Sequence, residues 1–548
     1  MSTTTELINS NFGGIRRKHS AFSSERITCS DCQNVELFDT GINSGVGLRT
    51  VKGNVSITSA IPENETVIGI FETIQGGANY FFVYTESESS GTLYNLSIGA
   101  NTLTPLISGL KVTGKASGCD FKQGWSDYFV FSNGEDIKYI YTDNATNIVL
   151  QVEQDDNVQL VDPDGRQVKG LGLVDFDSKL WVFDGKVLWH SKKEDCRVFN
   201  FVDTSVPGSS GYIEFVKDIT AIYPYLGSLA VFHKDSSCLV KKDETTVFKV
   251  EDESPGGCAS YNSLVFHGTD LYFYDDTKKG VFSFQQVING DKTLGDNIAE
   301  DIQEELLQIR TANLDKIRAL SVVTKDRDEV WFLVPISHDD NYSIVMIFDY
   351  SRGEWVKRKC QKINAMAVVD STLYSAGKTV YEEYNTDTFN GEFIGSEYIC
   401  SVMNLGEDNT LKITKFPPRI AVDSSYRNNF MVKYVKNYNV LKTPKVKEIK
   451  AKSLKNILVY DTDHTYDTIY SYQPSTVTLI AKLPSVSAKA LEITFYTEKE
   501  MQDFCIKSLE MSKIKVKQVW LLLELQNTNF SIMKNVVRCL MSIEKFLM

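Results

Sequence analysis

Short apolar strands separated by tight turns constrain the fold of this chain more than any other feature of its sequence. The clearest example is Leu180–Phe201, in which Leu180–Phe183 and Lys186–His190 are apolar segments separated by Asp184–Gly185. Asp-Gly between alternating apolar residues predicts a hairpin whose two central residues have positive φ. Variants of this run recur along most of the chain, so we expect a radial stack of small antiparallel sheets.

The strand–turn–strand pattern extends from about residue 51 to residue 395. The segments expected to be strands are Thr66–Thr73, Tyr80–Tyr84, Thr92–Ile98, Tyr128–Phe131, Ile137–Tyr141, Leu229–Phe232, Cys238–Lys241, Ser263–Phe266, Leu271–Tyr274, Gly280–Phe284, Glu329–Val334, Ser343–Asp349, Met366–Val369, Thr372–Ser375 and Thr379–Tyr384. Sheets of three or four short strands that repeat at roughly 40–50 residues are typical of a β-propeller. We therefore predict an all-β chain with a propeller of six to eight blades over residues 51–395.

Three further segments complete the predicted organisation. Residues 1–50 are expected to form an extended N-terminal arm, because Gly41, Gly45 and Gly47 would interrupt a regular element. A helix is expected over Asp296–Arg310, where four apolar residues share one face and acidic residues lie towards the start. The spacing of strands lengthens after residue 395, so residues 396–548 are expected to form a separate β-sandwich-like domain.

The expected strands of this C-terminal domain are Lys412–Val422, Phe430–Lys436, Asn456–Tyr460, Ser475–Ala481, Ala490–Tyr496 and Ile514–Leu525. Periodicity does not decide whether residues 532–547 form a helix or a strand. The longest apolar run, near Trp520–Leu523, is too short to span a bilayer, so we expect no membrane insertion. The first residues lack a basic segment followed by an apolar one, which predicts synthesis in the cytoplasm.

Charge is distributed unevenly along the chain. Residues 401–548 hold 22 of the 58 basic and 14 of the 71 acidic residues, a formal charge of +8, so the first 400 residues carry −21. Much of the positive charge comes from Lys433, Lys436, Lys442, Lys445, Lys447, Lys450, Lys452 and Lys455. Two interpretations stay open: a solvated loop, or a surface that contacts an acidic partner or a DNA backbone.

The sequence predicts no catalytic residue, cofactor site or metal site. Cys29 and Cys32 form the one CxxC among ten cysteines, and no second pair stands at a zinc-site distance, so ordinary reduced thiols are expected. The histidines are interpreted as structural or surface residues: His19, His190, His233, His267, His338 and His464.

Acidic residues also fail to match a known catalytic or metal-binding motif. The segment Asp461–Asp467 lacks the glycine of an EF-hand loop, and the pairs at 155–156, 275–276 and 339–340 are interpreted as turn acids that face solvent. The segment Ser351–Trp355, preceded by Asp349, has Gly and Trp at the wrong spacing for the Asp box of sialidase propellers. We therefore predict that the chain is not an enzyme.

Several short motifs follow one another along the chain. They are Gly13–Ile15, Asn34–Glu36, Gly47–Arg49 with Gly53, Ser126–Phe131 with Asn133–Gly134, Trp189, Ser191, Asp195 and Phe199, Gly257–Cys258 with Ser263, Gly280–Ser283, Phe348–Tyr350, and Gly353–Trp355. In this order they resemble the motifs of the propeller-bearing tail proteins of short-tailed bacteriophages, a family of tail nozzle, tail tubular or tail hub proteins and packaged-DNA stabilisation proteins. The proline that usually follows the aspartate in that family is Cys196 here.

The resemblance implies a structural role in the virion tail. Such proteins form a six-fold ring below the portal and adaptor, line the DNA exit channel, help to retain the genome and provide attachment points for fibres. The implied partners are further copies of the chain, portal, adaptor and tail fibre proteins, and double-stranded DNA bound without sequence specificity. The alternatives are a propeller that binds glycans or proteins at the host surface and, less favoured, a glycoside hydrolase with paired carboxylates.

Overall fold

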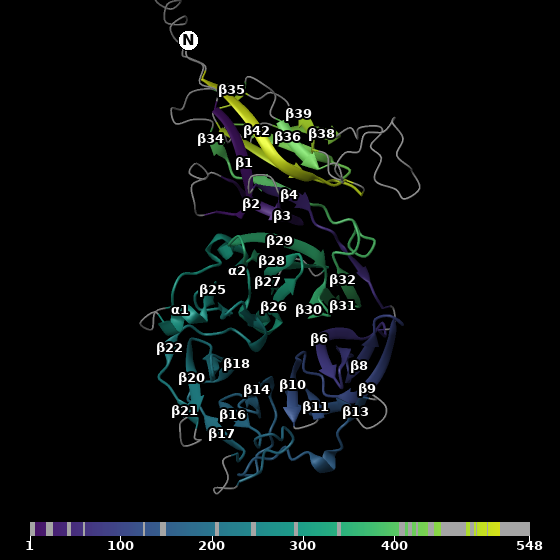
Figure 1. Ribbon diagram of the computed structural model, residues 1–548, viewed down its shortest axis with the longest axis vertical. Coiled ribbons are helices and arrows are strands. Elements are labelled where there is room, and N and C mark those ends of the chain that lie inside the picture. Colours follow the sequence, from purple (N-terminus) through teal and green to yellow (C-terminus); the bar gives the residue numbers. More distant parts are fainter. Residues whose placement is uncertain are drawn as a thin grey trace, which may run out of the picture.

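The protein is described by a computed structural model in which nearly all regular secondary-structure elements are β-strands (Figure 1). The described residues are 6–17, 26–40, 45–58, 61–123, 126–142, 150–202, 208–242, 248–289, 294–336, 341–404, 412–414, 419–423, 426–436, 443–450, 478–482, 487–488, 490–500 and 502–515. Within them the chain forms seven small antiparallel sheets and one larger sheet system.

The seven small sheets are the blades of a β-propeller. Blade 1 contains β6 (Thr66–Gln75), β7 (Ala78–Glu86), β8 (Gly91–Ser97) and β9 (Thr102–Leu110); blade 2 contains β10 (Ser117–Gln123), β11 (Ser126–Ser132), β12 (Ile137–Thr142) and β13 (Leu150–Val152); blade 3 contains β14 (Leu171–Phe176), β15 (Lys179–Asp184), β16 (Val187–His190) and β17 (Gly211–Glu214). Blade 4 contains β18 (Ile219–Tyr225), β19 (Ser228–His233), β20 (Ser236–Lys242), β21 (Phe248–Val250) and β22 (Ser254–Pro255).

The remaining blades complete the ring. Blade 5 has three strands, β23 (Leu264–His267), β24 (Asp270–Asp275) and β25 (Gly280–Ser283); blade 6 contains β26 (Arg318–Thr324), β27 (Arg327–Val334), β28 (Tyr342–Asp349) and β29 (Glu354–Gln361); blade 7 contains β30 (Ile363–Val369), β31 (Thr372–Gly377), β32 (Val380–Glu383) and, from the other end of the propeller segment, β5 (Asn54–Ser56). Because β5 pairs antiparallel with β32, one blade joins both ends of the propeller and closes it.

Neighbouring blades are held together by apolar cores. Buried side chains of blades 1 and 2 form one cluster, those of blades 2 and 3 another, and this pattern continues around to a cluster shared by blades 7 and 1. The first strands of the blades, β6, β10, β14, β18, β23, β26 and β30, face the axis. Closure therefore buries both faces of each sheet, and the predicted propeller is confirmed.

The hairpin in Leu180–Phe201 differs from its prediction in one detail. Asp184 pairs with Val187, so the turn consists of Gly185 and Lys186, and Gly185 has a φ of +56° whereas Asp184 and Lys186 do not have positive φ. Positive φ at the first central residue alone is the pattern of a type II′ turn, which glycine favours. The hairpin was therefore predicted correctly, but its turn is shifted by one residue.

The helix expected over Asp296–Arg310 is largely replaced by shorter turns. The segment contains the 3₁₀ turn η3 (Glu300–Ile302) and the one-turn helix α2 (Gln303–Leu306). Residues outside the segment form hydrogen bonds with the backbone at its start. The Ile298 amide donates to the Val281 carbonyl, and the Ile298 carbonyl accepts from the Trp355 indole. The expected apolar face is nonetheless used, because Ile302, Leu306 and Ile309 are buried.

Four other short helices lie in the described part of the propeller segment. They are η1 (Asp155–Asn157), η2 (Tyr261–Ser263), η4 (Thr311–Lys316) and α1 (Phe284–Asn289), which follows β25 directly. No described helix is long and apolar enough to cross a membrane.

The larger sheet system forms a second domain, built from both ends of the described chain. Its strands are β1 (Glu6–Ile15), β2 (Arg26–Gln33), β3 (Val35–Asp39), β4 (Val46–Thr50), β33 (Glu397–Cys400), β34 (Met403–Asn404), β35 (Lys412–Thr414), β36 (Arg419–Asp423), β37 (Asn429–Lys436), β38 (Lys445–Lys450), β39 (Thr478–Lys482), β40 (Ser487–Ala488), β41 (Ala490–Tyr496) and β42 (Cys505–Lys515). The expectation of an extended N-terminal arm over residues 1–50 is thus corrected for the described residues, which form strands of this sheet system. Strand β1 pairs antiparallel with β42, near the other end of the described chain, and parallel with β2. These backbone hydrogen bonds make the N-terminal segment part of the sheet.

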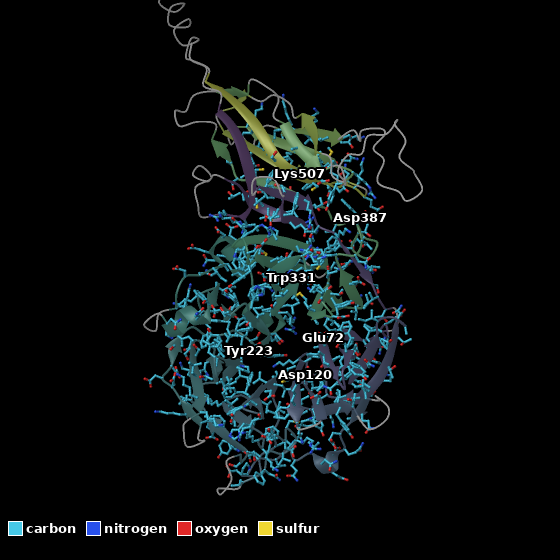
Figure 2. The ribbon with its side chains drawn as sticks, viewed as in Figure 1. Glu72, Asp120, Tyr223, Trp331, Asp387 and Lys507 are labelled. Atoms are coloured by element: carbon cyan, nitrogen blue, oxygen red, sulfur yellow. The ribbon has the colours of Figure 1, made fainter. Side chains whose placement is uncertain are left out.

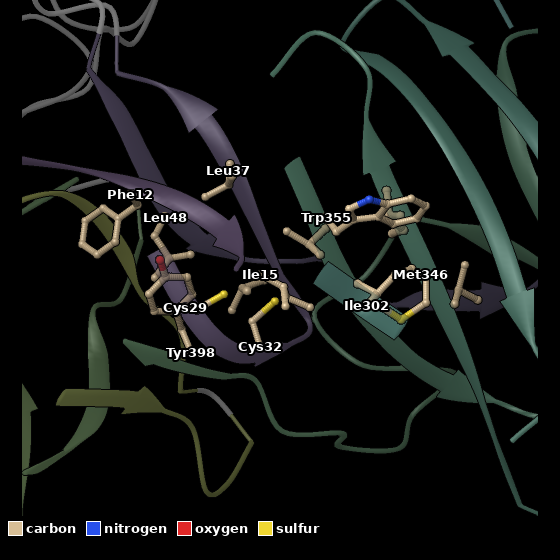
Figure 3. Packing of buried hydrophobic residues seen from close by; sticks show 14 of the residues in the cluster. Phe12, Ile15, Cys29, Cys32, Leu37, Leu48, Ile302, Met346, Trp355 and Tyr398 are labelled. Carbon is tan, nitrogen blue, oxygen red and sulfur yellow. The ribbon is translucent and has the colours of Figure 1, made fainter. Parts of the chain in front are cut away.

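Strand β1 connects the two halves of this sheet system. One half contains β42, β36 and β4, and the other contains β2, β33, β41 and β37. Apolar side chains from both halves meet in one core, in which Phe12 lies 5.7 Å from Tyr398 and 6.4 Å from Phe495 between ring centroids. The same core continues into blades 5 and 6 of the propeller, and Figure 3 shows Phe12 and Tyr398 on one side and Met346 and Trp355 on the other.

The second domain covers the outermost strand of blade 6. Strands β1, β2 and β3 contact β29, which would otherwise be an exposed sheet edge (Figure 1). The Asn34 amide donates to the Lys357 carbonyl at 2.9 Å, and its side-chain oxygen accepts from the Lys359 amide at 2.8 Å. Covering an edge strand removes unpaired backbone groups from solvent, so propeller and second domain form one continuous structure.

Candidate functional site

A cavity of about 880 Å³ lies between the second domain and the turns of blades 6 and 7, and we call it the junction cavity. Arg327 lies on its wall and pairs with Glu36 of β3 at 2.6 Å and with Glu329 of β27 at 3.0 Å. Glu36 also accepts from Arg49 of β4 at 2.5 Å. These ion pairs connect two strands of the second domain to blade 6.

The pKa values of the two carboxylates at Arg327 are shifted in opposite directions, which raises the question of acid–base chemistry. Burial opposes ionisation of both, yet Arg327 and Arg49 hold the pKa of Glu36 below its usual value, whereas burial keeps the pKa of Glu329 raised. All four oxygens nevertheless have donors: Arg49 and Arg327 on Glu36, and Arg327 and the Trp331 indole on Glu329. The arrangement therefore favours a structural network over a pair of catalytic carboxylates.

Tyr384 extends this network into the propeller. The Arg327 guanidinium lies 3.4 Å from the centroid of its ring and the Arg358 guanidinium 4.7 Å, and Tyr384 itself has a φ of +62°. Arg358 is fully buried and pairs with the equally buried Glu383, which also accepts from Asn54 of the closing strand β5 at 2.9 Å. The same group of side chains thus stabilises both the ring closure and the domain junction.

The N-terminal residues that carry the family resemblance gather at this junction. A Cβ atom on Gly14 would lie 2.5 Å from the Trp355 carbonyl oxygen, so glycine allows β1 to approach β29 closely. Asn34 hydrogen-bonds to β29 and Glu36 pairs with Arg327, as described above. Arg352, which directly precedes the Gly353–Trp355 motif, pairs with Asp39 at 2.9 Å. Motifs that are hundreds of residues apart in the sequence are therefore neighbours in the fold.

A second concavity, which we call the channel-mouth pocket, lies where the inner strands β18 and β23 end. It has a volume of about 650 Å³ and a wall of stacked aromatic rings, since Tyr223 and Phe266 lie 5.9 Å apart at an interplanar angle of 12°. Leu226, at the tip of the β18–β19 turn, is 78% exposed and has a φ of +46°. In the view of Figure 2, Asp120 and Tyr223 are both labelled towards the centre of the propeller.

The carboxylate of Asp175 also lines the channel-mouth pocket. Burial, and then repulsion from Asp177, raise the pKa of Asp175 to about 6. Among the described residues neither a cation nor a hydrogen-bond donor pairs with its side chain. An aromatic wall beside an unpaired carboxylate suits a ligand that offers polar or cationic groups together with a flat apolar face.

One tyrosine crosses the propeller channel. Tyr261 of η2, which precedes blade 5, accepts a hydrogen bond from the Ala116 amide at 3.1 Å and donates to the Ala116 carbonyl at 3.0 Å. Ala116 precedes the inner strand of blade 2, and blades 2 and 5 are not neighbours in the ring. The axis of the individual propeller is therefore obstructed at this level.

Cysteines and histidines lie mostly inside the fold. Cys29, Cys32 and Cys400 are buried together on β2 and β33, all free, and burial raises the pKa of Cys29 well above its usual value. No group of three metal-ligating side chains occurs in the part of the chain that the structure describes. His190, His233 and His267 are buried, whereas His19, His338 and His464 lie outside the described residues.

The acidic motifs considered in the sequence have varied outcomes. Asp349 accepts from Ser351 and the Arg352 amide, so the Asp-box-like segment forms a turn of blade 6. Asp275 is 1% exposed, so the prediction that it faces solvent was wrong. Its buried carboxylate accepts hydrogen bonds from the Gly257 and Thr277 amides and so stabilises the turn after β24. Residues 155–156 are exposed, as expected, whereas 339–340 and 461–467 lie outside the described residues.

The lysine-rich segment is partly a strand. Lys433 and Lys436 belong to β37, and Lys445, Lys447 and Lys450 to β38, the last strand of the main sheet path. Lys442, Lys452 and Lys455 lie outside the described residues. For its described part the loop interpretation is thus corrected, because β37 offers β38 a six-residue antiparallel ladder. Exposed lysines on a terminal strand hinder pairing with further strands.

Comparison with known proteins gives a distant structural likeness, which carries no argument about this chain. No family model matches the sequence, and no curated protein matches it. A crystal structure of a catalytically inactive virginiamycin B lyase from Staphylococcus aureus with quinupristin matches 60% of this chain and 97% of its own, with 10% sequence identity and a TM-score of 0.36. The matched protein is a β-propeller, and the likeness carries no information about activity.

Proposed function

We propose that this chain is a structural protein of the tail of a short-tailed bacteriophage. In this proposal it forms a homohexameric nozzle or hub ring that lines the DNA exit channel, docks portal, adaptor and fibre proteins, and has no catalytic role. The observation that carries the proposal is the junction: the residues behind the family resemblance, Gly14, Asn34 and Glu36, all attach the second domain to blade 6. A protein that must transmit force between neighbours benefits from such a fixed junction.

Two further observations support this reading. Because Tyr261 crosses the propeller channel, a DNA duplex would run through the opening between subunits and not along the axis of one propeller. The first 400 residues, which include the whole propeller, carry a formal charge of −21. An acidic wall adheres weakly to a sliding polyanion, which is what an exit channel requires.

Mass photometry of the purified full chain, alone and with portal and adaptor proteins, tests the proposal. We expect either a discrete species of six chain masses, each 61.8 kDa, or recruitment of the chain into a complex with the adaptor. A chain that remains monomeric with every partner and instead binds oligosaccharides would contradict the proposal.

The channel-mouth pocket favours the second candidate, a propeller that binds glycans or proteins at the host surface. Its stacked Tyr223 and Phe266 and the free Asp175 are the side-chain types that bind sugars or basic residues. Oligosaccharide binding that Tyr223→Ala abolishes would favour this candidate over the tail ring.

A further inference from the structure

A third cavity lies on the opposite end of the inner strands, between blades 6, 7 and 1. This blade 6–7 pocket has a volume of about 250 Å³ and lies where β26, β30 and β6 begin. Its apolar walls are formed by Ile68, Leu333, Val334, Pro335, Ile336, Ile344 and Ile363. Since one water takes up about 30 Å³ of liquid, the pocket has room for a compact ligand of roughly ten non-hydrogen atoms.

Among the described residues, the charged side chains that line this pocket are all cations. Lys316 and Lys362 are exposed at its edge, and Arg318 lies half-buried at the start of β26. The Arg318 guanidinium donates to two backbone carbonyls, those of Asp315 and Ile317. None of the three cations forms an ion pair within the described chain, where most other arginines pair with carboxylates.

A guanidinium beside apolar walls has lost hydration, and Asp315 and Tyr261 compensate for that loss only in part. Burial lowers the pKa of Arg318, which shows that its surroundings disfavour the charged form. An incoming anion would restore the missing compensation, and Arg can bind a carboxylate through two parallel hydrogen bonds. The apolar walls require that the rest of the ligand be hydrophobic.

We infer that the blade 6–7 pocket binds a small amphiphilic carboxylate, whose carboxyl group contacts Arg318, Lys316 and Lys362 and whose aliphatic tail fills the apolar part. This site is distinct from the junction cavity and the channel-mouth pocket. It does not depend on the proposed tail function, because it is defined by one chain alone. The binding is non-covalent and involves no chemical conversion.

Isothermal titration calorimetry of the full chain with octanoate, and with octanamide as its neutral analogue, tests the inference. A charge-assisted contact predicts that octanoate binds about 10- to 100-fold more tightly than octanamide. Arg318→Gln should remove that preference. The matched control Lys186→Gln, an exposed lysine in the blade 3 hairpin, should leave both affinities unchanged.

A second variant keeps the test decisive if Arg318→Gln does not fold. Lys316 and Lys362 are exposed, so Lys316→Gln/Lys362→Gln should fold normally and weaken octanoate binding several-fold while leaving octanamide unaffected. Equal affinity for octanoate and octanamide, or no binding of octanoate, would overturn the inference.

The chain itself contains the main competitor for these cations. Ile336 and Tyr342 line the pocket, and residues 337–341 connect them in the sequence. Residues 337–340 lie outside the described residues and include Asp339 and Asp340. Octanoate that binds to Asp339→Asn/Asp340→Asn but not to the unaltered chain would identify these acids as the occupants and refute the inference. Similar affinity of both proteins for octanoate supports it.

Discussion

The hydroxyl group of Tyr261 bonds to both backbone groups of Ala116, 145 residues earlier in the chain, and so connects two blades that are not neighbours in the ring. Tyr261→Phe would leave an amide and a carbonyl without partners in the channel. We expect a loss of about 1–3 kcal/mol in the free energy of unfolding. Urea titration followed by circular dichroism would measure this loss as a lower midpoint with an unchanged slope.

Tyr141→Phe is the matched control, because the Tyr141 hydroxyl makes one exposed hydrogen bond, to Gln151. Its cost should stay below about 0.5 kcal/mol. Equal costs for Tyr141→Phe and Tyr261→Phe would mean that the bond across the channel contributes nothing particular to stability.

The close approach of β1 to β29 makes Gly14 sensitive to substitution. An added Cβ would lie 2.5 Å from the Trp355 carbonyl oxygen, which is backbone and cannot rotate away, so Gly14→Ala should cost about 1–3 kcal/mol. At Gly13 the nearest atom is the Thr28 methyl group at 3.3 Å, so Gly13→Ala should cost clearly less. Chemical denaturation compares the two, and limited proteolysis would show faster cleavage between the domains in Gly14→Ala alone.

Glu383 is the acid that connects the ring closure to the junction. Its carboxylate accepts from Arg358, Asn54 and Ser375, and it is 5% exposed. Glu383→Gln would leave the buried Arg358 charge uncompensated, for which we expect a loss of about 3–5 kcal/mol.

Asp387→Asn provides the comparison for Glu383→Gln. Asp387 pairs with Arg427 at 3.4 Å on the surface (Figure 2), so its loss should cost no more than about 1 kcal/mol. Thermal unfolding of both variants beside the unaltered chain provides the test. If the midpoints of thermal unfolding of the two variants fall by the same amount, Glu383 does not stabilise the ring closure and the junction as we describe.

Local patterns predicted the blades, because each hairpin depends on residues that are close in sequence. Gly185, for example, supplies the positive φ that the turn between β15 and β16 requires. The family motifs indicated which N-terminal residues matter, but their meeting at β29 involves separations of more than 300 residues. No local signal encodes such a contact.

The corrected predictions share the same physical cause. The helix expected over Asp296–Arg310 was shortened because Trp355 of β29 binds its backbone and Arg17, which follows β1, binds one of its acids. The N-terminal arm became β1 because β42, near the other end of the described chain, offers it a backbone ladder. The unpaired Arg318 was likewise invisible in the sequence, since only the fold shows which cations lack a carboxylate.

The raised pKa of Asp175 predicts a specific dependence of stability on pH. Its folded-state pKa of about 6 exceeds the usual 3.8, so the folded chain binds the proton more tightly than the unfolded chain. Ionisation of Asp175 therefore destabilises the fold: stability should fall as pH rises from about 4 through 6. The shift corresponds to roughly 3 kcal/mol at most, and partial exposure to solvent reduces this to about 1 kcal/mol.

Asp175→Asn removes this charge and should be more stable than the unaltered chain by about 1 kcal/mol at pH 8, with no difference near pH 4. Urea unfolding at pH 4, 6 and 8 would follow the difference. Asp155→Asn, at an exposed residue of η1, should change stability little at any of these pH values. If the free energies of unfolding of Asp175→Asn and the unaltered chain instead differ by the same amount at pH 4 and pH 8, the effect is due to packing. The ionised Asp175 carboxylate would then not destabilise the fold.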